Sequence, residues 1–304
     1  MDDASSDSTP EICASYGDRI RYVRQASTRG QFGNVNDGVA LATGDLIGVF
    51  HADDVYLPHM LEREIEWLER FPDAGAVFCS DVFVDAHGKE LGRLELPPEI
   101  RGGRPLDYPS VLNALLMYKN RFLRCPTALV RASVYRELGL YREQEFKNTS
   151  DLEMWLRIVR RYPIGVLDDH LQLYRRRPGS SSHSYQRART DPERFFTIMD
   201  LELRSGAFSV ATAEAVRSYE AHRAHDATMR AVSHYVLGDV SGARAALRGV
   251  GIRALLRGRQ IQSVRLSMLS VGLRLLVRLP RVPAIARAFE RRWYGRAPSG
   301  AISP

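Results

Sequence analysis

The feature that most constrains the fold is a pair of apolar segments on either side of one amphipathic helix. Residues 46–50 (LIGVF) and 76–84 (AVFCSDVFV) each predict a buried strand, and residues 57–70 between them predict a helix. Strand, helix and strand at this spacing predict a right-handed βαβ unit in a parallel sheet. The apolar face of the helix is expected to carry Leu57, Met60, Leu61, Ile65 and Leu68.

From about residue 195 onward, the sequence pattern predicts consecutive helices and no strands. We therefore predict an α/β domain over residues 1–190, with helices on both faces of its sheet, and an α-helical region over residues 191–304. Further strands are expected at 19–24, 127–131, 164–168 and 170–175, and further helices at 33–43, 110–118, 132–138 and 151–161.

The composition indicates a folded protein of a reducing compartment. Apolar residues make up 44% of the 304 residues, which is enough for a packed core. Cys13, Cys79 and Cys125 are widely spaced and form no C-x-x-C pair, so a disulfide framework is not expected. Every stretch of 18 residues contains a charge, which argues against a membrane-spanning helix. We expect a cytoplasmic protein.

The net charge of +7 is concentrated at the C-terminal end. Residues 251–304 contain 11 arginines, no lysine and one glutamate, so the remainder of the chain is slightly acidic. Basic amphipathic helices of this kind are typical of an anionic membrane surface, such as the inner face of the cell membrane. The alternative is an arginine-rich bundle that packs on the first domain. Nucleic-acid binding is not expected, because no recognition motif is present.

The first apolar strand ends in His51-Ala52-Asp53-Asp54, an acidic pair just before a helix. In parallel α/β sheets, ligands bind at the carboxyl ends of the strands. Carboxylate oxygens are the ligands that Mg²⁺ or Mn²⁺ prefers, and Mg²⁺ usually keeps substrate phosphates in its shell. The alternative is a structural turn in which an aspartate caps the helix. The local sequence favours neither.

Two later segments carry further candidates. Asp151 opens the expected helix 151–161, where it is either part of a Ser150-x-x-Glu153 capping box or a general base. The local pattern favours the cap. The segment LYRRRPGSSS, residues 173–182, is suited to gripping a diphosphate or is a solvated loop, and the loop is the commoner case.

Taken in order, these motifs resemble a family 2 glycosyltransferase of GT-A fold, the Rossmann-like fold of nucleotide-diphospho-sugar transferases. The resemblance covers roughly residues 1–185. The matching motifs are Asp2-Asp3, Asn36-x-Gly38, the strand ending His51-Ala52-Asp53-Asp54, Ser150-Asp151, and Tyr174-Arg175.

The resemblance implies roles for particular residues. It places Asp3 at the nucleotide base, Asp53 at a Mg²⁺ or Mn²⁺ ion and Asp151 as the base that deprotonates the acceptor. The expected contacts to the nucleotide sugar are Asp3, Asn36, His51, Asp53, Arg175 and Arg177.

The chain departs from the family pattern in three places. His51 stands where the first acid of the D-x-D element is expected, and Arg177 stands where a histidine is expected. The first strand-helix-strand unit of the family is missing before Asp2, and we expect it to lie upstream in the natural chain.

The implied activity is inverting transfer of a sugar from a nucleotide-diphosphate donor to a hydroxyl of a glycan or lipid-linked acceptor. Such a reaction belongs to polysaccharide assembly at the cell envelope. Two alternatives stay open at this point: an inactive relative that binds nucleotide sugars or serves as a scaffold, and a basic helical module that associates with membranes.

Overall fold

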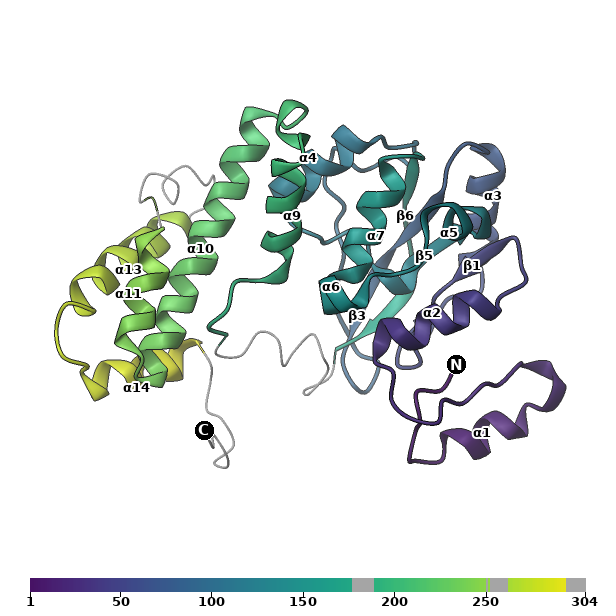
Figure 1. Ribbon diagram of the computed structural model, residues 1–304, viewed down its shortest axis with the longest axis horizontal. Helices are drawn as coiled ribbons and strands as arrows, with labels where there is room; N and C mark the ends of the chain where they lie inside the picture. The colour runs from purple at the N-terminus through teal and green to yellow at the C-terminus, as the bar shows by residue number, and fades with distance from the viewer. Residues whose placement is uncertain (177–188, 250, 252–261, 294–304) are drawn as a thin grey trace. The chain divides into compact units, whose positions relative to one another are not determined.

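The computed structural model describes residues 1–176, 189–249, 251 and 262–293 (Figure 1). The chain divides into two compact units, Met1–Arg176 and Arg177–Pro304. The first unit contains the β-sheet and the second is helical in its described residues. The boundary expected between residues 190 and 191 falls inside the second unit.

Six strands of the first unit form one mixed sheet in the order β1-β5-β3-β6-β2, with β4 paired to β3. β3 and β6 are parallel, whereas β5 runs antiparallel to both β1 and β3 and lies between them. The expectation that β1 and β3 run in the same direction is therefore confirmed. The expectation that they are neighbours is wrong, because β5, from much later in the chain, lies between them. The strands are β1 (Leu46–Gly48), β2 (Val55–Tyr56), β3 (Ala76–Val84), β4 (Glu90–Arg93), β5 (Ala128–Arg131) and β6 (Ile164–Arg175).

Two strand expectations differ from the structure. The segments 164–168 and 170–175 are one strand, β6, and its register against β3 shifts around Ser80. The strand expected at 19–24 does not form. Arg24 makes a single parallel bridge with Asp2, and residues 17–19 form a short 3-10 helix. One bridging residue provides too few ladder hydrogen bonds to sustain a strand there.

Helices cover both faces of the sheet, as expected. Val77 and Cys79 of β3 pack against α3 on one face, whereas Phe78 points to the other face. There its ring meets Trp155 of α7 edge to face, with 5.0 Å between ring centroids. Trp155 is fully buried, so it is a core residue. The helices of this unit are α1 (Thr9–Ser15), α2 (Gln31–Leu41), α3 (Met60–Arg70), α4 (Tyr108–Tyr118), α5 (Ala132–Leu138), α6 (Glu143–Phe146) and α7 (Ser150–Val159).

The buried face of α3 is rotated from the expected one. Leu61 and Ile65 are 45% and 37% exposed, and Glu64 and Trp67 are buried in their place. Trp67 lies over Gly165 of β6, where an added Cβ would come within 2.4 Å of the ring, and its indole N–H donates to the carbonyl of Gly103. The largest apolar side chain thus fixes the rotation of the helix and brings a glutamate into the core.

The second unit is built on the long helix α10. Ala231, Val232 and Tyr235 of α10 form a buried cluster with residues of α11, α13 and α14. Gly238 ends α10 in the left-handed conformation (φ 91°), and Asp239 caps α11 by accepting a 2.8 Å hydrogen bond from the N–H of Gly242. Among the described helices, none combines the length and the apolar character needed to cross a bilayer. The helices are α9 (Arg194–Arg204), α10 (Ala213–Leu237), α11 (Val240–Arg248), α13 (Gln262–Leu276) and α14 (Pro283–Trp293).

The buried Glu64 makes the stability of this protein depend on pH. Burial raises the pKa of Glu64 from 4.5 to about 8, and the nearby Cys79 thiol only partly offsets that rise. Because the carboxyl ionises more easily in the unfolded chain, the free energy of unfolding falls as the pH rises from about 4.5 to 8.

We predict that Glu64→Gln removes this pH dependence. The variant should match the wild-type protein near pH 5 and exceed it by about 3 kcal/mol near pH 8, because a neutral amide needs no ionisation penalty. Urea unfolding at both pH values measures the difference. Glu69→Gln, at an exposed position of the same helix, is the matched control. An unchanged pH slope in Glu64→Gln would contradict the prediction.

Candidate functional site

The candidate site lies at the carboxyl ends of the parallel strands. β1, β3 and β6 share one direction, and β1 and β2 occupy opposite margins of the sheet. The chain leaving β1 at Gly48 must therefore cross the edge where β3 and β6 end before it reaches β2 at Val55. Residues 51–54 lie on that crossing, so the acidic pair stands at the edge where α/β sheets bind their ligands.

Asp54 anchors the crossing segment to β6. One of its carboxylate oxygens accepts from the side-chain amide of Gln172 at 2.8 Å, and the other accepts from the backbone N–H of Arg175 at 2.9 Å. Partial burial raises the pKa of Asp54, and the Arg175 N–H works against that rise. Asp54 is thus a structural anchor as well as a charge at the site.

Arg175 holds the same segment from a second direction. Its Nε donates to the backbone carbonyl of Asp53 at 3.0 Å, and its Nη1 donates to the carbonyl of Ala86 at 3.2 Å. The guanidinium therefore clamps two loops at the sheet edge. Its predicted contact with a nucleotide sugar stays a prediction. Arg177, the other predicted arginine, lies outside the described residues.

His51, Asp53 and Asp54 form a candidate metal site. One ligand atom from each lies within 4.8 Å of the other two. The His51 Nε2 is buried and has no hydrogen-bond partner among the described residues, and burial lowers the pKa of this histidine, which favours the neutral imidazole. A neutral imidazole nitrogen without a partner beside two carboxylates is a donor set that fits a divalent cation.

Arg124 and Asp81 belong to the same region and are functional candidates that the sequence analysis missed. Arg124 directly precedes the 3-10 turn that leads into β5, and its Nε lies 2.6 Å from a carboxylate oxygen of the fully buried Asp81 on β3. Burial raises the pKa of Asp81 to about 6 although Arg124 opposes the rise. The Arg124 guanidinium also lies 4.0 Å from the centre of the Tyr174 ring.

Arg124 is the residue that connects the predicted acids to one another. Its positive charge acts on Asp54, Asp81 and Asp151 and lowers the pKa of each against the effect of burial. Asp54 of the acidic pair and the predicted base Asp151 are thus both influenced by the charge of Arg124. A polar residue inside the apolar run 76–84 was a sequence signal for Asp81. Arg124 had no such signal, since its position follows from the insertion of β5 next to β3.

Asp151 lies in the first turn of α7, as expected, but the capping box does not form. The Ser150 hydroxyl donates to the Lys147 carbonyl at 2.6 Å, and Glu153 instead pairs with Arg157 at 3.0 Å. Burial raises the pKa of Asp151 from 3.8 to about 6, while its hydrogen bond from the Leu152 N–H, at 2.8 Å, favours the charged form. A carboxylate poised near neutral pH is suited to general-base work. The catalytic role of Asp151 stays a prediction.

Asp3 contacts the residues just before α2, and Asn36 lies in the middle of that helix. The carboxylate of Asp3 accepts from the backbone N–H groups of Arg29 and Gly30, at 2.6 and 3.1 Å. The amide of Asn36 donates to the carbonyl of Tyr141 and accepts from its N–H, both at 2.9 Å. These contacts make both residues structural, and their nucleotide-sugar contacts stay predictions. A cavity of about 350 Å³ adjoins Asn36 and Tyr141.

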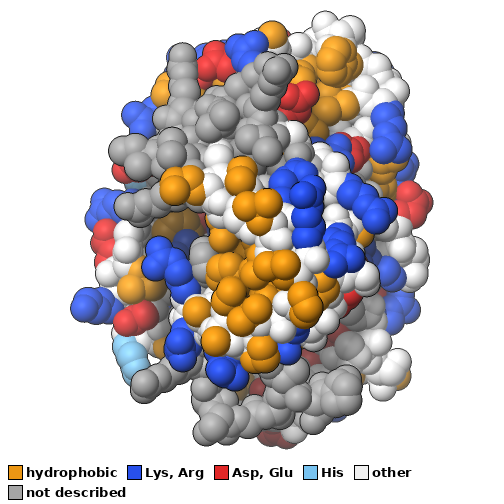
Figure 2. All heavy atoms as spheres, turned by 90° about the vertical axis from the view of Figure 1, so that its left-hand side faces the viewer, with side chains coloured by type: hydrophobic (Ala, Val, Ile, Leu, Met, Phe, Trp, Pro, Cys, Tyr) orange, Lys and Arg blue, Asp and Glu red, His pale blue; other side chains and the backbone are white. Residues whose placement is uncertain are grey.

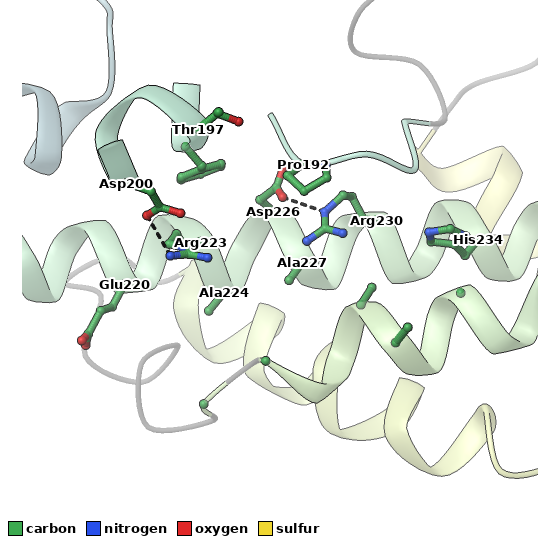
Figure 3. A pocket seen from close by; sticks show the side chains of 16 residues that line it. Pro192, Thr197, Asp200, Glu220, Arg223, Ala224, Asp226, Ala227, Arg230 and His234 are labelled. Carbon is green, nitrogen blue, oxygen red and sulfur yellow. Dashed lines mark hydrogen bonds and ion pairs between the residues drawn. The ribbon is translucent and has the colours of Figure 1, made fainter. Parts of the chain in front are cut away.

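The second unit contains a larger pocket of about 1000 Å³ (Figure 3). Its lining contains two ion pairs, Asp200 with Arg223 at 2.9 Å and Asp226 with Arg230 at 2.8 Å, and one further carboxylate, that of Glu220. Figure 3 shows these side chains on α9 and α10, with small residues such as Ala224 and Ala227 between them. Since each arginine is neutralised by an aspartate, the pocket carries no strong field of one sign.

Comparisons with known proteins agree with the geometry of the first unit. The family model for glycosyl transferase family 2 matches residues 1–139. EpsE of Bacillus subtilis strain 168, which is named as a glycosyltransferase, is 31% identical over 161 residues, which are 51% of this chain and 53% of EpsE. The uncharacterized protein Rv1520 of Mycobacterium tuberculosis is 26% identical over 280 residues, which are 89% of this chain and 72% of that protein.

Solved structures agree on the fold. The crystal structure of S. aureus TarS 1–349, in complex with UDP-GlcNAc, matches with a TM-score of 0.56 at 13% identity, covering 94% of this chain and 81% of that one. That structure supports the GT-A fold expected from the sequence. The chain spans about half the length of EpsE. The family match ends before Asp151 and β6, so the contributions of those elements rest on the structure. Residues 1–139 match the family model for glycosyl transferase family 2, so the first unit is similar to that family in sequence and to GT-A transferases in fold.

Proposed function

We propose that this chain is a metal-dependent inverting glycosyltransferase that uses a nucleotide-diphosphate sugar as donor. The observation that carries the proposal is the grouping of His51, Asp53 and Asp54 at the carboxyl edge of the sheet, within the residues that match the glycosyl transferase family 2 model. The electrostatic link from Arg124 to Asp151 adds a base to that grouping. We propose a hydroxyl of a glycan or of a lipid-linked carrier as acceptor.

The geometry supports a division of labour between the residues. Asp53, with His51 and Asp54 beside it, would hold a divalent cation, which when bound supplies positive charge next to the leaving diphosphate. Asp54 and Arg175 keep the segment in place through β6. Asp151 accepts the proton of the acceptor hydroxyl as its oxygen attacks the anomeric carbon from the face opposite the leaving group. UDP-GlcNAc, the ligand of the TarS structure, is the first donor to test.

We predict that Asp53→Ala abolishes metal-dependent nucleotide binding. Binding of UDP and GDP to the full chain, measured by calorimetry with and without Mn²⁺, should be strengthened by Mn²⁺ in the wild-type protein and not in the variant. Removing a carboxylate that ligates the metal should cost more metal affinity than the roughly 10- to 100-fold lost with an outer-shell partner, which is enough to remove the Mn²⁺ effect. Asp73→Ala, at an exposed loop position, is the matched control. Equal Mn²⁺ stimulation in Asp53→Ala would refute the metal role.

We predict that Asp151→Asn retains nucleotide binding and loses transfer. A base must be ionised, so the wild-type transfer rate should rise with pH up to about 6, the pKa of Asp151, and then level off. The transfer rate of the asparagine variant should be lower than that of the wild-type protein by a factor of about 10² or more, as expected for the loss of a general base. Release of UDP from a labelled donor measures turnover. Loss of nucleotide binding in the variant would instead make Asp151 structural, and binding without turnover in the wild-type protein would favour the scaffold alternative.

The same variant has a stability readout that does not depend on activity. Because the pKa of Asp151 is raised on folding, its ionisation disfavours the folded state as the pH rises from about 3.8 to 6. Asp151→Asn should therefore have the wild-type melting temperature near pH 4 and a higher one at pH 7.5. The gain at pH 7.5 corresponds to about 1–3 kcal/mol in the free energy of unfolding. A lower melting temperature at pH 7.5 would show that the carboxylate is stabilising.

A further inference from the structure

Helix α13 of the second unit is apolar on two sides. Leu273 and Val277 are 1% and 4% exposed and belong to the buried cluster with α10, α11 and α14. On the other side of the helix, Met268 is 71% exposed, Val271 40% and Leu275 60%, and Leu279, just after the end of the helix, is 58% exposed. We call Met268, Val271, Leu275 and Leu279 the α13 patch. A helix that needs only one apolar face to pack has no folding reason for the second.

Basic residues accompany the α13 patch. Arg278 and Arg281 are exposed and alternate in sequence with Leu279 and Val282, and the segment 262–289 contains no acidic residue. Arg281 is held in place because its guanidinium donates to the carbonyls of Tyr235 and Val236, at 3.2 and 2.7 Å. Figure 2 shows a cluster of hydrophobic side chains with Lys and Arg side chains beside it.

The exposed apolar side chains and the arginines beside them together favour one kind of partner over another. A second copy of the chain, meeting patch to patch, would bring the same arginines against each other, because a two-fold interface pairs each surface with itself. An anionic lipid surface complements both features, since its headgroups attract arginine and its acyl boundary accepts leucine and methionine. A surface helix needs no membrane-spanning length, which agrees with the described helices.

We infer that the α13 patch docks the chain onto an anionic lipid bilayer, with Leu275 and Leu279 entering the headgroup–acyl boundary and Arg278 facing lipid phosphates. The inference rests on the helical unit alone and stands or falls independently of sugar transfer. It would bring the enzyme to a surface where a lipid-linked acceptor resides.

Flotation of the full chain with vesicles tests the inference. The wild-type protein should float with vesicles of phosphatidylcholine and phosphatidylglycerol in 50 mM salt and should float weakly with pure phosphatidylcholine. In the double variant Leu275→Ser/Leu279→Ser, the ratio of vesicle-bound to free protein should fall more than tenfold. The matched control is Leu201→Ser/Phe208→Ser, which removes two side chains of the same unit that are 47% and 63% exposed, and it should bind as the wild-type protein does.

A charge variant and measurements of folding and oligomeric state complete the test. Arg278→Gln should weaken binding to the anionic vesicles by roughly fivefold, the value of one arginine near such a surface, with the wild-type melting temperature retained. Equal flotation of the leucine variant and the wild-type protein would overturn the inference. So would a wild-type dimer in light scattering that becomes monomeric in the leucine variant while neither form floats, because that outcome assigns the patch to a second copy.

Discussion

The anchoring of Asp54 to β6 is the interaction on which the candidate site depends. β1 and β2 lie at opposite margins of the sheet, so the chain between them has no strand neighbours to fix its path. Gln172 and the Arg175 N–H fix that path by occupying both oxygens of one carboxylate. The Arg175 guanidinium adds a bond to the Asp53 carbonyl. These bonds hold Asp53 and Asp54 at the sheet edge, beside His51, whose backbone N–H donates to the Tyr56 hydroxyl at 2.6 Å.

Arg124 solves the electrostatic difficulty that the anchoring creates. Several carboxylates gather at one sheet edge, and adjacent negative charges raise the pKa of their neighbours, as Asp53 does to Asp54. Arg124 opposes this for Asp54, Asp81 and Asp151, and its own position is fixed by the ion pair with the buried Asp81. Breaking such a pair leaves an uncompensated buried charge, so Asp81 positions the cation rather than contacting a ligand.

The sequence predicts the bounds of individual helices and strands well, but it predicts poorly which elements lie next to one another. The extent of β3 and of α5 was predicted to the residue, because an apolar run and a glycine stop are local signals. The insertion of β5 between β1 and β3 is a long-range pairing with no local signal, and it decides where Arg124 lies. The burial of Glu64 was also missed, because helical periodicity cannot tell that Trp67 will fix the rotation of α3 against Gly165. At the site, the sequence indicated Asp53 and Asp151 by type and place, but not that Asn36 and Arg175 hold backbone groups.

The acids of this unit show how environment sorts one functional group into different roles. Asp2 receives hydrogen bonds from Ser5 and Tyr22, and its pKa falls to about 2, so it remains charged at any physiological pH. Glu64 lies in an apolar core where only the nearby Cys79 thiol favours its charged form, and its pKa rises to about 8, so it remains neutral near pH 7. Asp151 lies between these extremes, with one backbone donor and a distant cation against burial, and its pKa is about 6. Of these three, only Asp151 is both ionised at neutral pH and basic enough to accept a proton, because a base is most effective when its pKa lies just below the working pH. Asp81 has the same pKa of about 6, but its carboxylate is held in the ion pair with Arg124, so Asp151 remains the candidate base.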